Sequence, residues 1–499
     1  MAYLGIDIGT SGCKALALSS AGEILATHTA TYGLDQPRPG WTQQDPAIWV
    51  KGARDAVSKV LETVPVGDIK CIGLSGQMHG FTPLDANGEV LRPAILWNDQ
   101  RNAAEAQEIE ERAGGREALL SLTNNRMLVG YTGGKIVWMQ VHEPKLFDQV
   151  RHALNPKDYL RYVLTGEVAT EVSDASGTGL FDVRERQWCQ PLIDKLPFDS
   201  AILPPCYESM EVSGTVSVLG ASLFALTAGI PVIGGGGDSV IQTLGTGVAE
   251  SGPLQTTIGT AGITAAALDA PKSNPDGRMQ VFCNVAPDLW HCMGVSLNAG
   301  GALGWLRQLL GGTQDFEDMV RGAGEVPAGA EGLVFLPYLN GERCPHPDPT
   351  ARGAFVGLSA RHDARHMTRA LMEGVVFALY DIYRQMAGMG INGRLIKASG
   401  GGARSEIWRQ MQADMFGCPV VTIEGAAEGG AFGAALLAGV SLGNWSSITE
   451  AAGCCSELTR QSPSDKQHEL YGSAYEIYAE LYPALQPSFA ALNRMGDAI

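Results

Sequence analysis

The 499-residue sequence lacks any run of about 20 apolar residues that is free of charges or of several glycines, which is the length that a membrane-spanning helix requires. It also lacks a basic segment before its first apolar run, and Asp7 lies inside that run, so the N-terminus is not typical of a signal peptide. We therefore expect no membrane partner and a cytoplasmic location.

Paired cysteine motifs are absent as well. Ten cysteines occur, but none belongs to a Cys-x-x-Cys pair and no regular spacing links them. This pattern argues against a zinc site and against a disulfide framework. Reduced thiols are expected, in agreement with a cytoplasmic protein.

Positive charge is scarce relative to negative charge. The 36 Lys and Arg residues face 53 Asp and Glu residues, which gives a net charge of −17. A nucleic acid would be repelled at long range, so non-specific nucleic-acid binding is not expected. A bound triphosphate would have to be held by local donors and a metal ion.

Glycine is abundant, with 63 residues, and it marks two similar turns. Residues 5–14 read Gly-Ile-Asp-Ile-Gly-Thr-Ser-Gly-Cys-Lys, and residues 256–264 read Thr-Thr-Ile-Gly-Thr-Ala-Gly-Ile-Thr. Each segment is an apolar β run, a Gly-Thr turn and a second β run, and the N–H groups and hydroxyl of such a turn suit a phosphate. Two such turns indicate duplicated halves that hold a nucleoside triphosphate from both sides.

The length of the chain predicts two domains rather than one core. We place the boundary in the glycine-rich stretch 245–252, which gives domains 1–247 and 248–499, the second ending in a helix from about Asp465. The pattern predicts a mixed α/β fold in which the second half repeats the first more loosely. The expected strands are 3–8, 14–18, 23–31, 69–74, 254–258, 262–268, 395–398 and 420–423; the expected helices begin at 46, 239, 363, 404 and 430.

Asp238 is the strongest candidate for a catalytic group. It follows an apolar β run and the four glycines 234–237, and glycine lets backbone and ligands approach closely. In a phosphotransferase this carboxylate would accept the proton of the attacking hydroxyl and orient that hydroxyl. The alternative is a turn aspartate that caps the helix predicted at 239–244.

The first glycine turn supplies candidates for phosphate and metal. Thr10 and Ser11 would donate to phosphates, Lys14 would be a supporting cation, and Asp7 would bind Mg²⁺ directly or through water. The alternative is a plain hairpin with an ordinary edge aspartate. An acid in the middle of an apolar strand is costly to bury unpaired, which favours a functional Asp7.

Three further segments have polar groups at predicted strand ends. Met78 and His79 follow the strand 69–74, and Trp97 and Asn98 precede Asp99, so both segments suit a polyol or sugar. The turn 399–405 offers a flat backbone surface and a helix N-terminus to a nucleotide. The alternatives are a structural histidine, a strand cap and a plain tight turn.

These segments together resemble the FGGY family of carbohydrate kinases, within the actin-like, sugar kinase and Hsp70 superfamily. The similar segments lie between residue 5 and about residue 440, and they are most similar to the bacterial members that phosphorylate xylulose. The matching segments are Gly-Ile-Asp-Ile-Gly-Thr-Ser-Gly (5–12), Ser-Gly-Gln-Met-His-Gly (75–80), Leu-Arg-Pro-Ala-Ile-Leu-Trp-Asn-Asp (91–99), Pro-Lys-Asp-Tyr-Leu-Arg (156–161), Ser-Asp-Ala-Ser-Gly-Thr (173–178), Gly-Gly-Gly-Asp (235–238), Phe-Leu-Pro-Tyr-Leu-Asn-Gly-Glu-Arg (335–343) and Gly-Gly-Gly-Ala-Arg-Ser-Glu-Ile-Trp-Arg-Gln-Met (400–411).

The resemblance implies two actin-like (ribonuclease H-like) α/β domains around a central cleft, where Mg²⁺, ATP and the sugar meet. It implies that Asp238 is the general base and that Met78 and His79 contact a ketose. The implied reaction is ATP-dependent phosphorylation of D-xylulose to D-xylulose 5-phosphate, by a protein that forms a homodimer as many of the family do. The implied phosphate and nucleotide contacts are Thr10, Ser11, Thr260, Gly300, Gly402 and Ser405.

Some residues depart from the pattern of the xylulose-specific members. Ser239 replaces an asparagine after the base, Ala261 replaces a serine in the second turn, and Cys344 replaces a threonine. These changes leave a sister kinase for ribulose, xylitol or another polyol as an alternative. A more distant alternative is an actin- or Hsp70-like nucleotide switch, which has no need of the sugar candidates Met78 and His79.

Overall fold

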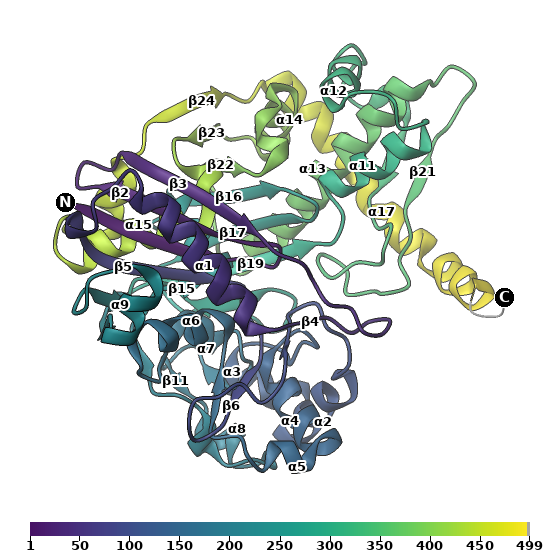
Figure 1. Ribbon diagram of the computed structural model, residues 1–499. Coiled ribbons are helices and arrows are strands. Elements are labelled where there is room, and N and C mark those ends of the chain that lie inside the picture. Colours follow the sequence, from purple (N-terminus) through teal and green to yellow (C-terminus); the bar gives the residue numbers. More distant parts are fainter. Residues whose placement is uncertain (497–499) are drawn as a thin grey trace. The chain divides into compact units, whose positions relative to one another are not determined.

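The computed structural model describes residues 1–496, and the packing divides the chain into two compact units (Figure 1). Unit 1 contains Met1–Glu250, Leu268–His291 and Glu428–Ser456; unit 2 contains Ser251–Ala267, Cys292–Ala427 and the chain from Glu457. The first exchange between units falls close to the proposed boundary at 247/248, but two later segments return to unit 1. Within residues 1–496, no helix combines the length and the hydropathy needed to cross a membrane.

A mixed sheet forms the centre of unit 1, with strand order β13-β14-β5-β1-β2-β3 and β15 beside β5. The first three strands are antiparallel neighbours, while β5 and β15 run parallel to β1 and to β5 respectively. The bounds are β1 (Ala2–Ile8), β2 (Gly12–Ser19), β3 (Ile24–Thr31), β5 (Ile69–Gly76), β13 (Val212–Thr215), β14 (Pro231–Ile233) and β15 (Gly236–Gly237).

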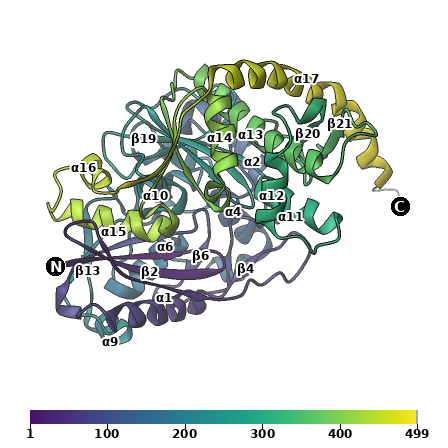
Figure 2. The same ribbon diagram turned by 90° about the horizontal axis from the view of Figure 1, so that it is seen from above.

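Two helices cover opposite faces of this sheet, as Figure 2 shows. Helix α1 (Pro46–Leu61) begins where predicted, because the Asp45 side chain accepts a hydrogen bond from the Ala47 N–H and Pro46 occupies the first turn. Helix α15 (Gly429–Ser441) packs on β1 and β5 on the other face, beside α10 (Asp238–Gly245). The candidate site residues Asp7 and Asp238 lie on β1 and at the start of α10.

Glycines let α15 lie directly on the sheet. A Cβ added at Gly5 or Gly73 would lie less than 3.0 Å from the carbonyl oxygen of Ala431 or Ala434, and one added at Gly433 would similarly meet the Ile241 carbonyl. A side chain at any of these positions would push the helix away from the sheet or from α10. This close packing is the physical reason why Glu428–Ser456 belongs to unit 1 rather than to the C-terminal half.

Shorter elements complete unit 1. The helices are α2 (Ala103–Ala113), α3 (Arg116–Thr123), α4 (Thr132–His142), α5 (Pro144–Phe147), α6 (Pro156–Thr165), α7 (Val172–Ser176), α8 (Gln190–Ile193), α9 (Val218–Phe224) and α16 (Ile448–Gly453). The strands are β4 (Gln43–Gln44), β6 (Thr82–Leu84), β7 (Ala94–Ile95), β8 (His152–Leu154), β9 (Thr170–Glu171), β10 (Phe181–Asp182), β11 (Gln187–Trp188), β12 (Cys206–Tyr207) and β18 (Gln280–Cys283).

Unit 2 repeats the hairpin-and-parallel-strand pattern of unit 1. Strands β16 and β17 form an antiparallel hairpin, and β16 also pairs in parallel with β22, as β1 does with β2 and β5. The strand order is β19-β17-β16-β22-β23-β24. The bounds are β16 (Pro253–Ile258), β17 (Gly262–Leu268), β19 (Trp290–Ser296), β20 (Val334–Leu336), β21 (Ala354–Val356), β22 (Leu395–Ser399), β23 (Val420–Ile423), β24 (Glu457–Gln461), α11 (Gly300–Leu309), α12 (Phe316–Gly324), α13 (Ala364–Gly388), α14 (Glu406–Phe416) and α17 (Asp465–Gly496).

Candidate active site

Three neighbouring parallel strands of unit 1 end beside one another, and a predicted site residue lies at or just beyond the end of each strand. Asp7 is on β1, Met78 follows β5, and Asp238 follows β15. The register places Asp7 opposite Ser75, and Ser75 opposite Gly236 on the other side of β5. The carboxyl ends of parallel strands are where α/β proteins bind their ligands.

Asp238 is the first residue of α10, and Gly237 is the N-cap residue. The helix-cap alternative for Asp238 is therefore wrong. Its carboxylate instead accepts from the N–H of Ser239 (2.7 Å) and from the backbone of Met78. Burial, followed by the charge of Asp7, raises the pKa of Asp238 to about 7, although the hydrogen bonds from Ser239 and Met78 lower it. The side chain is partly exposed, so a carboxyl with the proton affinity of a general base is accessible.

Asp7 accepts a hydrogen bond from the Ser75 hydroxyl, with an Oγ to Oδ1 distance of 2.6 Å. Burial raises the pKa of Asp7 above its ordinary value, although Ser75 and the charge of Lys14 lower it. Gly430 lies over this carboxylate, since a Cβ added there would be 2.9 Å from Asp7 Cγ. Lys14 forms an ion pair with Glu428 at 3.1 Å, so a contact between Lys14 and a phosphate would compete with Glu428.

The chemistry of Asp7 fits a magnesium ion that arrives with a nucleotide. Mg²⁺ is usually held by one or two carboxylates together with waters and substrate phosphates, rather than by a cage of protein ligands. Residues 1–496 contain no cluster of three or more His, Cys, Asp or Glu side chains arranged to hold a metal. The Asp7 carboxylate supplies the kind of oxygen ligand that a Mg²⁺–triphosphate complex requires.

The turn between β1 and β2 brings a phosphate candidate against a sugar candidate. The Gly9 N–H donates to the Gly12 carbonyl (2.9 Å) and closes the turn, with Thr10 and Ser11 at its tip. Thr10 Oγ1 accepts from Trp97 Nε1 (3.0 Å) and donates to Gln77 Oε1 (3.1 Å). No role was predicted for Gln77, although it lies between the predicted strand and Met78.

Met78 and His79 lie against two glycines. A Cβ on Gly237 would be 2.5 Å from Met78 Cγ, and one on Gly177 would be 2.7 Å from His79 Nδ1. His79 has a positive φ of 67°, which is uncommon for a residue other than glycine. Its Nδ1 lies 2.7 Å from the Gly177 carbonyl, so Nδ1 carries a proton and donates to that oxygen.

The segment Trp97–Asp99 differs from the prediction in one respect. Trp97 is 37% exposed, and Asn98 Oδ1 has no hydrogen-bond partner within the described chain, so both are suited to contact a ligand. The Asp99 carboxylate is not, because it is buried and accepts from Arg101 (2.7 Å) and from the Thr42 N–H (2.5 Å). Asp99 therefore holds the segment in place.

The predicted nucleotide residues of unit 2 gather around its Gly-Thr turn. The Ala299 N–H donates to the Thr260 carbonyl (2.9 Å), and the Gly300 N–H donates to the Gly259 carbonyl (2.8 Å). A Cβ on Gly402 would lie 2.5 Å from Ile258 Cγ2, so three chain segments meet here only because glycines allow it. The predicted contact Ser405 is the N-cap of α14 and accepts from the Trp408 N–H (3.1 Å).

Sequence reasoning missed a buried polar network behind Asp238. It connects Lys157, Glu171 and Ser173 to the glycine turn that precedes Asp238. Two matching segments, 156–161 and 173–178, were identified without a role for their side chains. The available signal was the pair Lys157 and Asp158, which lies in the first turn of α6, a helix that packs on the buried strand β5.

Comparison with known proteins identifies both halves of the chain. The N-terminal domain of the FGGY family of carbohydrate kinases matches residues 2–245, and the C-terminal domain of that family matches residues 254–442. The chain is 36% identical to the xylulose kinase of Escherichia coli over 488 residues, which cover 98% of this chain and all of the relative.

Solved structures agree with the sequence comparison. A crystal structure of a xyloylose kinase from Brucella ovis has a TM-score of 0.92 and 36% identity, and covers 98% of this chain and 100% of that one. A gluconate kinase from Lactobacillus acidophilus also has a TM-score of 0.92, with 27% identity over 98% of this chain and 99% of that one. The same fold therefore occurs in proteins named for different sugar substrates.

Proposed function

Because the chain belongs to the FGGY family of carbohydrate kinases, with ATP as the co-substrate, we propose that it phosphorylates D-xylulose to D-xylulose 5-phosphate. The name of the relative from Escherichia coli, similar over nearly its whole length, supports this sugar. The observation that carries the chemistry is the Asp238 carboxyl, with its pKa raised to about 7, beside Met78 and Asp7.

The proposed reaction is the transfer of the γ-phosphoryl group to a terminal hydroxyl. Asp238 accepts the hydroxyl proton while the oxygen attacks the phosphorus in line with the leaving ADP oxygen. Met78 and His79 hold the carbon chain of the ketose, with Trp97 and Asn98 as further contacts. The backbone and hydroxyl donors of Thr10, Ser11, Thr260, Gly300 and Gly402, with Ser405 and Lys14 as supporting residues, bind the phosphates and the nucleotide.

Asp7 would hold Mg²⁺, directly or through water. When bound, the ion neutralises charge on the β- and γ-phosphates. The Ser75 hydroxyl fixes one oxygen of Asp7 and leaves the carboxylate aligned for this role. Exclusion of water matters as well, because water would otherwise compete with the sugar as the nucleophile.

The experiment that tests the proposal is an ADP-release assay over a panel of ketoses, aldoses, polyols and sugar acids, with ATP and Mg²⁺. We expect D-xylulose to give the highest kcat/KM, with mass spectrometry showing a single added phosphate. The absence of any sugar-dependent release above the ATPase background would disprove the kinase proposal. Omission of Mg²⁺ should abolish the release.

A second candidate is a kinase for another polyol or sugar acid. Two observations favour it: Ser239 departs from the asparagine of the xylulose-specific pattern, and a gluconate kinase shares the fold with a TM-score of 0.92. Ser239 donates from its N–H and its hydroxyl to Asp238 Oδ1, so this residue touches the proposed base. The same panel decides between the candidates by the ranking of kcat/KM.

Substitution His79→Ala should raise the KM for the sugar while the KM for ATP stays close to its original value. Loss of one hydrogen bond to a buried polar group costs about 1–3 kcal/mol, which corresponds to a rise of roughly 5- to 150-fold. Because Nδ1 is held by the Gly177 carbonyl, the contact with the ketose hydroxyl is expected at Nε2.

The control for this variant is His28→Ala, because His28 is exposed on β3. Steady-state kinetics with each substrate varied in turn separate the two constants. An equal rise of both KM values in His79→Ala would show that His79 supports the fold, and would remove it from the substrate contacts.

The remaining expectations follow from charge and family. A net charge of −17 opposes nucleic-acid binding, and we propose a cytoplasmic enzyme with no membrane partner. A homodimer is proposed from the family alone, and light scattering of the purified protein would measure it.

A further inference from the structure

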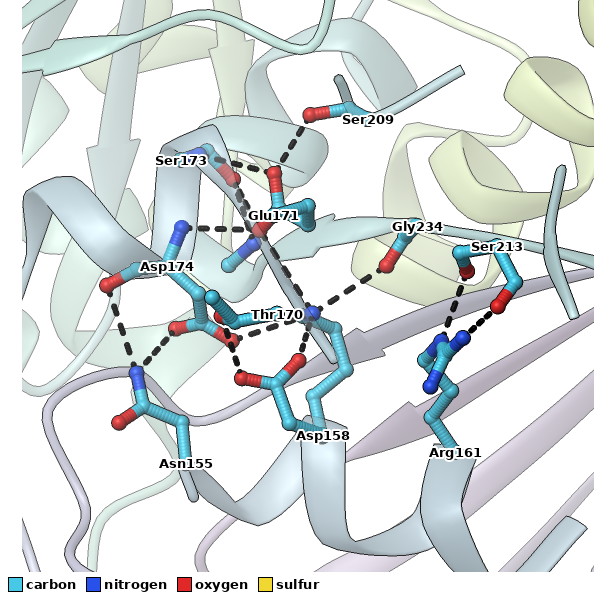
Figure 3. A network of polar contacts seen from close by, with 12 residues as sticks. Asn155, Asp158, Arg161, Thr170, Glu171, Ser173, Asp174, Ser209, Ser213 and Gly234 are labelled. Carbon is cyan, nitrogen blue, oxygen red and sulfur yellow. Dashed lines mark hydrogen bonds and ion pairs between the residues drawn. The ribbon is translucent and has the colours of Figure 1, made fainter. Parts of the chain in front are cut away.

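A network of buried charges lies behind the glycine turn of unit 1 (Figure 3). Lys157, in the first turn of α6, donates from Nζ to Asp158 Oδ1 (2.6 Å) and to the Gly234 carbonyl (3.2 Å). The same ammonium lies 3.6 Å from Glu171 Oε1 and 3.4 Å from Asp174 Oδ2. Figure 3 shows the three carboxyl groups converging on this point, and none of the four side chains is more than 1% exposed.

The charges of this network are balanced only in part. Burial alone would lower the pKa of Lys157, but the three neighbouring carboxyl groups outweigh it and raise the pKa. Burial raises the pKa of Asp174 well above its ordinary value, although the charge of Lys157 and the hydrogen bond from Asn155 lower it. Buried ion pairs of this kind are weak evidence for stability, because desolvation offsets their attraction. What such a network does supply is a fixed geometry.

The network connects to Asp238 through the backbone. Glu171 accepts from the N–H and the hydroxyl of Ser173, both at 2.8 Å. Ser173 Oγ in turn accepts from the N–H of Gly237 at 2.9 Å, and Gly237 immediately precedes Asp238. Since Lys157 holds the Gly234 carbonyl, both ends of the turn 234–237 are attached to the same network.

A turn of four glycines needs such attachment. Glycine has more conformational freedom than any other residue, and a base that shifts by about 1 Å can lose roughly 100-fold in rate. Ser173 lies on the short helix α7, and Gly177 follows that helix. The Gly177 carbonyl lies 2.7 Å from His79 Nδ1. One short helix thus supports both the proposed base and a proposed sugar contact.

We propose that Lys157, Glu171 and Ser173 are positioning residues that fix the turn 234–237 and so direct the Asp238 carboxylate at the sugar hydroxyl. This inference rests on the proposed kinase function for its kinetic consequence. The hydrogen bond from Gly237 to Ser173 is its central element, because removing one hydroxyl breaks the attachment without leaving a buried charge unpaired.

The test compares two serines of α7. Ser173→Ala removes the acceptor of the Gly237 N–H, and Ser176→Ala is the matched control. Ser176 is also buried, donates to the Val172 carbonyl (2.6 Å) and accepts from the Cys283 N–H (3.1 Å), so it makes the same kind of bond to a different strand. We expect kcat to fall roughly 10- to 100-fold in Ser173→Ala, whereas Ser176→Ala should keep the kcat of the wild type. The KM for ATP and the melting temperature should be similar in the two variants.

Hydrogen exchange followed by mass spectrometry provides a readout that does not need activity. The peptide that contains residues 234–238 should exchange faster in Ser173→Ala than in the wild type, and should not change in Ser176→Ala. Unchanged kcat and unchanged exchange in Ser173→Ala, or an equal loss in both variants, would overturn the inference. A wild type without sugar-dependent ADP release would instead disprove the proposed function, while the exchange data would still decide whether Ser173 holds the turn.

Discussion

Asp238→Ala is expected to lower kcat by about 10²–10⁴-fold, the range for loss of one positioned proton acceptor. The KM for ATP should hardly change, because the proposed nucleotide contacts are Thr260, Gly300 and Gly402. Single-turnover and steady-state assays with the preferred sugar measure the effect. The matched control is Asp238→Asn, which keeps the shape of the side chain and an acceptor for the Ser239 N–H but has no basic carboxylate, and should lose a similar factor.

The pH dependence gives an independent check on Asp238. Its pKa is raised to about 7, so the base is protonated and inactive when the pH lies below this pKa. Bound Mg²⁺ would lower the pKa. In the wild type, kcat/KM should therefore fall about tenfold per pH unit below this pKa. The residual rate of Asp238→Asn should lack that limb. Near-wild-type turnover in either variant would assign the role elsewhere, with Asp7 as the next candidate.

Gly5→Ala is expected to prevent α15 from packing on the sheet of unit 1. The added Cβ would overlap the Ala431 carbonyl oxygen, which belongs to the backbone of α15. Overpacking of a core costs about 1–3 kcal/mol and more where backbone must move, so we expect a loss at or above the upper end of that range. Urea unfolding and the melting temperature measure this loss, which is large beside a typical total stability of about 5–15 kcal/mol.

The control for this substitution is Gly67→Ala, because a Cβ at Gly67 meets no atom within 4 Å and its φ is not positive. It lies in the same unit and undergoes the same chemical change. Gly67→Ala should leave stability nearly unchanged. A Gly5→Ala variant as stable as this control would show that the distance between helix and sheet is not set by glycine.

The sequence predicted local structure well where turn chemistry fixes it. The helix predicted to begin at residue 46 is α1, and the strand predicted at 420–423 is β23. The two Gly-Thr turns correctly indicated the repeated hairpin and parallel-strand pattern. The return of α15 to unit 1 was not predicted, since it depends on glycines at positions 5 and 73, which lie far along the chain from the helix they contact.

The candidate site was predictable only in its most local features. The glycines before Asp238 and the polar residues after β5 could be recognised in the amino-acid sequence. The partners of these residues were not: Glu428 is more than 400 residues from Lys14, and Gly237 is 64 residues from Ser173. The ion pair between Asp99 and Arg101 joins residues that are close in sequence. It was not predicted, because an acidic residue that pairs with an arginine looks the same in the sequence as an acidic residue that binds a ligand.

The glycine-to-helix packing of unit 1 also bears on how the protein is made. The strands that α15 covers emerge from the ribosome first, and the helix emerges only after the intervening stretch of unit 2. At about 5–20 residues per second, the roughly 350 residues between the end of β5 at Gly76 and the start of α15 at Gly429 take about 18 to 70 seconds. Throughout that interval, one face of the nascent sheet has no cover and is open to chaperones or to other nascent chains. A release of the chain before residue 428 would leave that face without its helix, so an early stop in the second half should remove the first half from the soluble pool as well.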